Sequence, residues 1–160
     1  EEREESGETF VIRPEKTLPI KRTTRDPEKL KEVYEQGRNE ALKNLDKIKE
    51  RYISLLSKIP DVKFICPNSS PNVLSVAFLG VKASSLQNAL ENDVIIGKGS
   101  ACTSRSSKVS HVLDAIGLPL NVAESTVRIS FGAYNTVEEA EQAVEKIEYF
   151  VNYLRKYKRK

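Results

Sequence analysis

Residues 126–156 read T-V-R-I-S-F-G-A-Y-N-T-V-E-E-A-E-Q-A-V-E-K-I-E-Y-F-V-N-Y-L-R-K, and they predict a strand followed by a long helix. Apolar and polar side chains alternate over residues 126–132, as they do in a strand with one face on the core. Thr136 and Glu139 then form a capping-box pattern, after which apolar residues recur every three or four positions. The stretch therefore predicts a layer of sheet covered by a helix.

The segments that precede this unit extend the same pattern. Residues 62–65 and 72–79 predict short strands, and the Asn-, Ser- and Pro-rich residues 67–71 predict a turn between them. Short helices are expected near residues 83–92 and 109–117, the second closed by a glycine. The expected fold is α/β (α+β two-layer), a small sheet covered by helices.

A long helix is predicted to precede this sheet. Asp26-Pro27-Glu28 is typical of a helix start, because it offers an N-cap acceptor, a proline at the first position and a carboxylate near the positive helix end. An apolar stripe continues to Ile59, Gly37 weakens or interrupts the helix, and Pro60 ends it. The predicted division is an extended, disordered arm over residues 1–25 and one domain over 26–160. Within that domain, 26–59 form the long helix and 60–160 the α/β unit.

The composition favours one globular domain without a membrane span. The chain has 160 residues, a net charge of +3, and two cysteines, Cys66 and Cys102. Two cysteines make no disulfide framework, and no apolar run is long enough to cross a bilayer. The first residues are acidic and polar, unlike a signal peptide, so we expect a cytoplasmic protein. The small positive charge gives no reason to expect nucleic-acid binding.

Residues 94–104, V-I-I-G-K-G-S-A-C-T-S, carry the main candidate for chemistry. The β-branched residues 94–96 predict a strand end, and Gly97 and Gly99 permit a hinge or a close backbone approach. Small residues surround Cys102, and Lys98 and Arg105 bracket it with positive charge. An electropositive, uncrowded position favours the thiolate, which is the reactive form of the side chain.

Four motifs in order resemble the C-terminal part of the cysteine desulfurases, in particular the NifS/IscS branch of these pyridoxal-phosphate enzymes. They are G-S-A-C-T-S (99–104), S-H-V-L (110–113), A-I-G-L (115–118) and V-R-I-S-F-G (127–132). The resemblance covers roughly residues 44–160. It implies the small domain of a fold-type I pyridoxal-phosphate enzyme.

The resemblance implies two site residues. Cys102 would be the nucleophile that takes sulfur from L-cysteine as a persulfide and leaves alanine. Arg128 would bind the α-carboxylate of the substrate, because a guanidinium meets a carboxylate through two parallel hydrogen bonds. The sulfur would pass to an acceptor protein, such as an iron–sulfur scaffold or a tRNA-thiolation enzyme. Complete enzymes of this type are expected to be homodimers.

Several features depart from the family pattern. The family's cofactor lysine follows a histidine, but the one histidine here, His111, precedes Val112, so the pyridoxal-phosphate lysine is not in this chain. Ala133 replaces an arginine and Lys98 replaces a small residue. The isolated chain is therefore expected to be catalytically incomplete. We expect His111 to cap or pack a helix and Cys66 to be structural.

Residues 10–42 resemble a second family, the C-terminal tail of bacterial patatin-like phospholipases. The patatin nucleophile motif G-x-S-x-G is absent, so no lipase activity is implied. A fusion or a rearranged fragment would explain both resemblances. This leaves two alternatives to an enzyme part: a fused or truncated interaction module without chemistry, and a relay protein that accepts persulfide onto Cys102.

Overall fold

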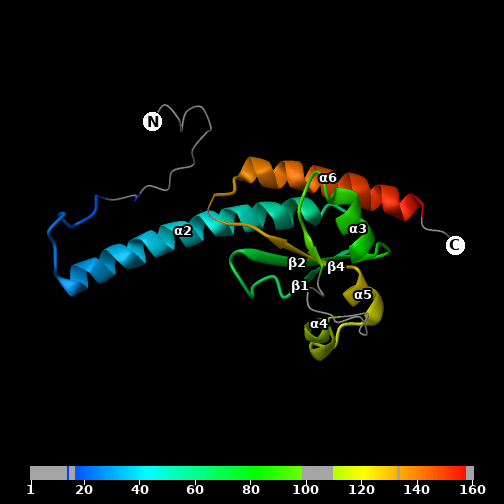
Figure 1. Ribbon diagram of the computed structural model, residues 1–160, viewed down its shortest axis with the longest axis horizontal. Coiled ribbons are helices and arrows are strands. Elements are labelled where there is room, and N and C mark those ends of the chain that lie inside the picture. Colours follow the sequence, from blue (N-terminus) through cyan, green and yellow to red (C-terminus); the bar gives the residue numbers. More distant parts are fainter. Residues whose placement is uncertain (1–13, 15–16, 99–109, 133, 158–160) are drawn as a thin grey trace.

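The computed structural model describes residues 14, 17–98, 110–132 and 134–157 (Figure 1). In chain order, the elements are α2 (Pro27–Leu56), β1 (Val62–Ile65), β2 (Val73–Phe78), α3 (Ala83–Leu90), β3 (Gly97–Lys98), α4 (His111–Ala115), α5 (Leu120–Glu124), β4 (Thr126–Ser130) and α6 (Val137–Lys156). No helix in these ranges is long and apolar enough to cross a membrane.

The four strands form one antiparallel sheet in the order β1-β2-β4-β3. The register pairs Leu74 of β2 with Ile129 of β4. Figure 1 shows α2 and α6 side by side along one face of this sheet, with α3 at the end of the same layer. The predicted two-layer α/β architecture is confirmed.

The core lies between the sheet and these helices. It is apolar, and its larger side chains come from every layer: Ile48, Leu56, Leu74, Val76, Phe78, Leu86, Leu90, Val127, Ile147 and Val151. In β4, Val127 and Ile129 are buried and Arg128 and Ser130 are exposed, as the alternation predicts. The capping box at the start of α6 is also present, since Thr136 and Glu139 satisfy each other's backbone donors.

The long helix differs from its prediction at one end. Asp26 caps α2 as expected, and Gly37 does not interrupt it. The helix ends at Leu56 rather than at residue 59, however, because Ile59 turns into the core and its N–H bonds to the carbonyl of Leu56. Pro60 therefore follows a turn and does not itself end the helix.

The predicted strand at residues 94–96 is wrong. This segment is held by α3, since the N–H of Val94 bonds to the carbonyl of Leu90 and the side chain of Gln87 donates to the carbonyl of Ile96 over 2.8 Å. Pairing with β4 begins only at Gly97. The short helix α5 had no counterpart in the sequence prediction.

The C-terminal end of α6 is bound to the strand layer through one arginine. Arg155, in the last turn of α6, donates from Nε to the carbonyl of Leu79 over 3.1 Å and from Nη2 to the carbonyl of Asp61 over 3.3 Å. Asp61 has a positive φ of 53°. The arginine thus ties the helix end to the turns on either side of the β1–β2 hairpin.

Candidate functional site

Arg128 lies in the middle of β4, on the face of the sheet that points away from α2 and α6. Its strand neighbours are Ser75 of β2 on one side and Gly97 of β3 on the other. The residues before and after it, Val127 and Ile129, are buried against the helices. Strand alternation therefore presents its guanidinium on the open face of the sheet.

Gly97 leaves room for this side chain. A Cβ at Gly97 would lie 3.5 Å from Nε and 3.6 Å from Nη2 of Arg128, so the guanidinium crosses the backbone of β3. The backbone of Gly97 lies in a ladder and does not have a positive φ. Of the two roles expected for this glycine, the close approach to another group is the one observed.

Arg128 forms no ion pair within the described ranges of the chain. An accessible guanidinium can donate two parallel hydrogen bonds, which makes it suited to bind the carboxylate of a ligand.

The other predicted site residue, Cys102, lies outside the described residues, as do Gly99 and Arg105. Lys98, at the end of β3, is exposed and pairs across the ladder with Val127.

The two remaining candidates are exposed. His111 is the first residue of α4, directly after Ser110, whose hydroxyl accepts from the N–H of Val112 at 3.3 Å. Ser110 is therefore the N-cap of α4, and the expected capping role of His111 is not observed. Cys66 follows β1 with a positive φ of 47° and is exposed, so it is not a buried core side chain.

The described residues do not fit pyridoxal phosphate. The cofactor needs a lysine for its Schiff base and an acidic or basic partner for its ring nitrogen. Lys49 is the one buried lysine in the described part of the chain, and its Nζ donates to the carbonyl of Ser70 over 2.5 Å.

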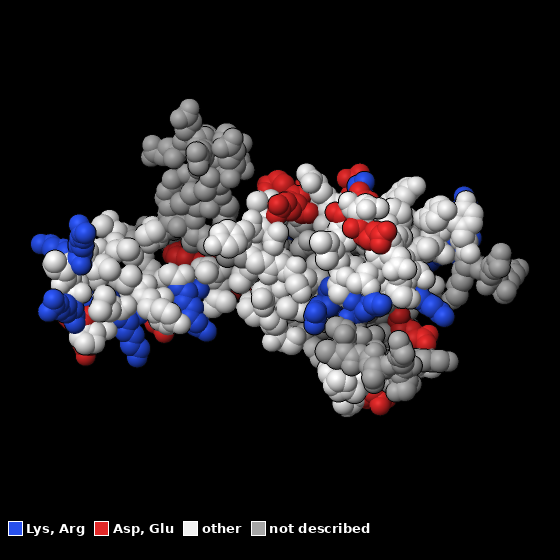
Figure 2. Space-filling model, viewed as in Figure 1, with Lys and Arg blue, Asp and Glu red and all other residues white. Residues whose placement is uncertain are grey.

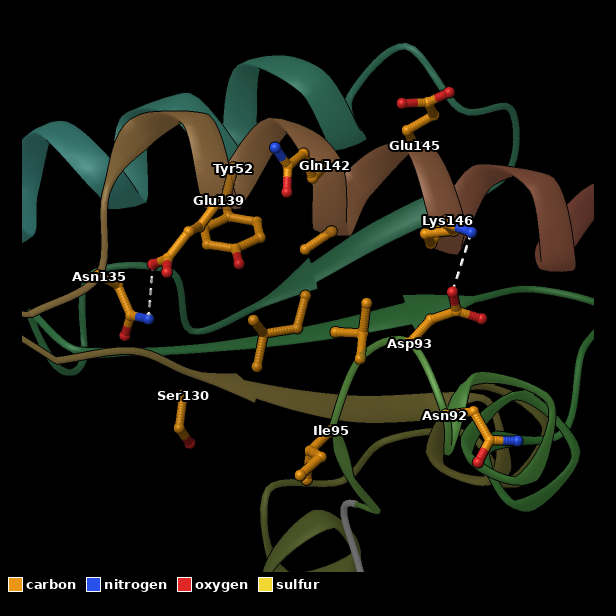
Figure 3. Close-up of a pocket in the computed structure, with 13 residues that line it drawn as sticks. Tyr52, Asn92, Asp93, Ile95, Ser130, Asn135, Glu139, Gln142, Glu145 and Lys146 are labelled. Atoms are coloured by element: carbon orange, nitrogen blue, oxygen red, sulfur yellow. Dashed lines mark hydrogen bonds and ion pairs between the residues drawn. The ribbon is translucent and has the colours of Figure 1, made fainter. Parts of the chain in front are cut away.

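A pocket that the sequence analysis did not predict lies between α6, α2 and the edge of β4 (Figure 3). It has a volume of about 690 Å³. Figure 3 shows the Tyr52 side chain pointing from α2 into it, next to Glu139. At its opposite end, Nζ of Lys146 and the carboxylate of Asp93 form an ion pair at 2.9 Å.

The electrostatics of this pocket follow from burial and from its carboxylates. Burial raises the pKa of Tyr52, and the charge of Glu139 raises it further. The hydrogen bond that Lys146 donates to Asp93 raises the pKa of Lys146.

On the face seen in Figure 2, acidic side chains gather over α6 and basic ones gather at the level of the sheet. Tyr52 belongs to the apolar stripe of α2, so periodicity alone gave no sign of the pocket.

The first 52 residues match a family model described as "Domain of unknown function (DUF6363)". This description names no activity, so the resemblance of residues 10–42 to phospholipase tails stays a prediction. The match accounts for about a third of the chain. The boundary at residue 25 also stays a prediction.

Curated relatives named "Cysteine desulfurase IscS" match most of the chain. The Proteus mirabilis protein is 36% identical over 129 residues, which is 78% of this chain and 32% of that protein. The Vibrio atlanticus protein is 40% identical over 106 residues, or 63% of this chain and 26% of that protein. The chain thus spans about a third of the length of these relatives. The longer alignment and the match to residues 1–52 together exceed the length of the chain, so the two matches overlap.

Solved structures give the same result. A "NIFS-LIKE PROTEIN" superposes with a TM-score of 0.62 at 29% identity, covering 79% of this chain and 32% of that one. A NifS-like protein from Rickettsia africae has a TM-score of 0.58 at 25% identity, covering 73% of this chain and 31% of its own. With this fold and these sequence matches, the chain contains a NifS/IscS-like domain, which corresponds to about a third of the length of these proteins.

Proposed function

We propose that this chain is part of a pyridoxal-phosphate-dependent cysteine desulfurase that takes sulfur from L-cysteine. The observation that carries the proposal is the guanidinium of Arg128, which lies on the open face of the sheet without an ion pair to any described residue, in a domain related to IscS proteins. In this role Arg128 binds the α-carboxylate of the substrate. Its planar fork offers two parallel donors, which fix the orientation of the amino acid as well as its position.

Cys102 is the proposed acceptor of the sulfur. It stands in the G-S-A-C-T-S motif, a few residues after β3, whose Gly97 pairs with Arg128. The Cys102 thiolate forms a sulfur–sulfur bond with the substrate while the substrate's carbon–sulfur bond breaks, leaving alanine and a persulfide. Lys98 and Arg105 favour the thiolate by their charge.

The rest of the enzyme would come from the portion of the relatives that this chain does not span. That portion would hold pyridoxal phosphate, since the residues described here do not. We further propose a homodimeric complete enzyme in the cytoplasm, which passes its persulfide to an iron–sulfur scaffold or a tRNA-thiolation enzyme.

A chimera tests the proposal directly. Residues 44–160 would replace the matching part of the Proteus mirabilis relative, and sulfide and alanine release from cysteine would be measured with a reductant. We expect activity from the chimera. In the chimera, Cys102→Ala is expected to abolish the formation of persulfide and the release of alanine. The absorbance of the bound cofactor should be the same as in the chimera without this substitution.

Arg128→Lys keeps the charge but loses the bidentate fork. We expect KM for cysteine to rise about tenfold or more, because hydrogen bonds to charged groups are about 1.5–3 kcal/mol each. Lys63→Arg, at the exposed position of β1, is the matched control and should leave KM unchanged. Unchanged sulfur transfer in Cys102→Ala, or unchanged KM in Arg128→Lys, would contradict the proposed roles.

A further inference from the structure

The hydroxyl of Tyr52 faces the pocket between α6, α2 and β4. Tyr52 is only 7% exposed, and its ring stacks on Phe131 with the centroids 5.5 Å apart. No hydrogen bond joins its hydroxyl to another described residue. Figure 3 shows this hydroxyl directed into the pocket. A phenolic hydroxyl that faces a pocket can accept or donate a hydrogen bond to a bound ligand.

The edge of β4 at the same pocket is open. The N–H of Phe131 bonds to the carbonyl of Asn72. The backbone N–H and C=O groups of the odd-numbered residues of β4 therefore point toward β2. In a strand, the backbone groups of the next residue point the other way. The N–H and C=O of Ser130 therefore point away from β2, toward the side where β3 pairs only with residues 127 and 128.

The peptide groups of Ser130 have no bond to any described residue on that side. The segment before β3 leaves the edge uncovered because α3 holds it, through the bonds of Val94 and Ile96 described above. Ile95, which also lines the pocket, is 93% exposed as a result. An open strand edge beside an exposed isoleucine is suited to an extended peptide.

The excess of acidic side chains in the pocket favours a peptide with a basic side chain. Asp93, Glu139 and Glu145 line it, against one lysine, Lys146, which already pairs with Asp93. Glu139 lies next to Tyr52 in Figure 3 and is near enough to raise its pKa. A cationic side chain entering here would meet the Glu139 carboxylate and donate to the Tyr52 hydroxyl oxygen.

We propose that this pocket is a docking site for an extended peptide segment that carries a basic side chain. The peptide backbone pairs with the N–H and C=O of Ser130, its apolar side chains cover Ile95, and its basic side chain enters beside Tyr52 and Glu139. The inference does not depend on the desulfurase proposal, because it uses neither Arg128 nor Cys102.

The test uses the 160-residue chain and the peptide acetyl-Val-Ser-Lys-Ser-Val-amide, in which the valines and the lysine share one face. Binding would be measured by calorimetry and by amide NMR shifts. We expect saturable binding, with the largest shifts at Ile129, Ser130 and Ile95. Replacing the central lysine by glutamate, or methylating the backbone nitrogen of the serine next to it, should each weaken binding about fivefold or more, since each removes one favourable contact.

Two variants probe the protein side. Tyr52→Phe keeps the ring stacked on Phe131 and removes the hydroxyl, and Glu139→Gln keeps the capping box and removes the charge. Each should weaken binding about fivefold. Glu148→Gln, on an exposed position of α6 outside the pocket, should not change it.

Absence of binding would overturn the proposal, as would equal affinity for the N-methylated peptide or for Tyr52→Phe. Equal affinity for acetyl-lysine-methylamide would also overturn it, because the site would then bind a small cation and not a strand. None of these outcomes affects the chimera experiment.

Discussion

The two long helices, α2 and α6, differ in how much of their length is buried. The buried residues of α6 run from Ala140 to Val151, whereas those of α2 begin only at Ile48. Figure 1 shows the N-terminal half of α2 projecting beyond the sheet. Leu30 and Tyr34 continue the apolar stripe there but are 44% and 64% exposed. The same periodicity therefore marks a buried face in one helix and an uncovered one in the other.

The largest expected contrast is between two identical substitutions in α2. Leu56→Ala should lower the free energy of unfolding by about 2–5 kcal/mol, because it empties a fully buried site. Leu30→Ala should change it by less than about 0.5 kcal/mol. Urea unfolding followed by circular dichroism measures both. A large loss in Leu30→Ala would mean that the projecting half is packed against something.

The helix caps give a smaller contrast. Thr136→Ala should cost about 1 kcal/mol, because α6 is packed from its first turn and loses the capping box. Asp26→Ala removes the acceptor for the N–H groups of Glu28 and Lys29. It should reduce helicity while leaving the urea midpoint nearly unchanged, since fraying there uncovers no core. An equal shift in both midpoints would remove the distinction between the helices.

The smallest effect concerns Tyr52, where the two helices meet. Its pKa is raised in the folded state, so the folded protein holds the phenol proton more tightly than the unfolded chain. The resulting stability is present below the ordinary pKa of about 10 and is lost as the pH rises above it. Tyr52→Phe should therefore flatten the alkaline fall in stability, measured by urea unfolding at several pH values. Tyr149→Phe, at an exposed position, is the control and should leave the slope unchanged.

Sequence patterns predicted those parts of the fold that depend on local chemistry. The β4 alternation, the Thr136 capping box and the Asp26 cap are each visible in a few neighbouring residues. The resemblance to desulfurases pointed to Arg128, and β4 does present it on the open face.

The errors arose where distant contacts outweigh local preference. Residues 94–96 are β-branched, but the bond from Gln87 and the attachment to Leu90 keep them from pairing with β4. The prediction for the C-terminal end of α2 was wrong because the helix stops at Leu56, where the chain turns to bury Ile59. Tyr52, Ser130 and Glu139 line the pocket from three different elements, and the hydrophobic periodicity of one element cannot predict such an arrangement.

The bonds made by Arg155 constrain the order in which this domain is completed during synthesis. Its acceptors, the carbonyls of Leu79 and Asp61, precede it by 76 and 94 residues. A ribosome therefore releases the β1–β2 hairpin well before the arginine that secures its turns. The nascent hairpin first waits for its central partner strand, β4, and after that still lacks this clamp, so we expect full protection of the hairpin from proteolysis only once the end of α6 has emerged.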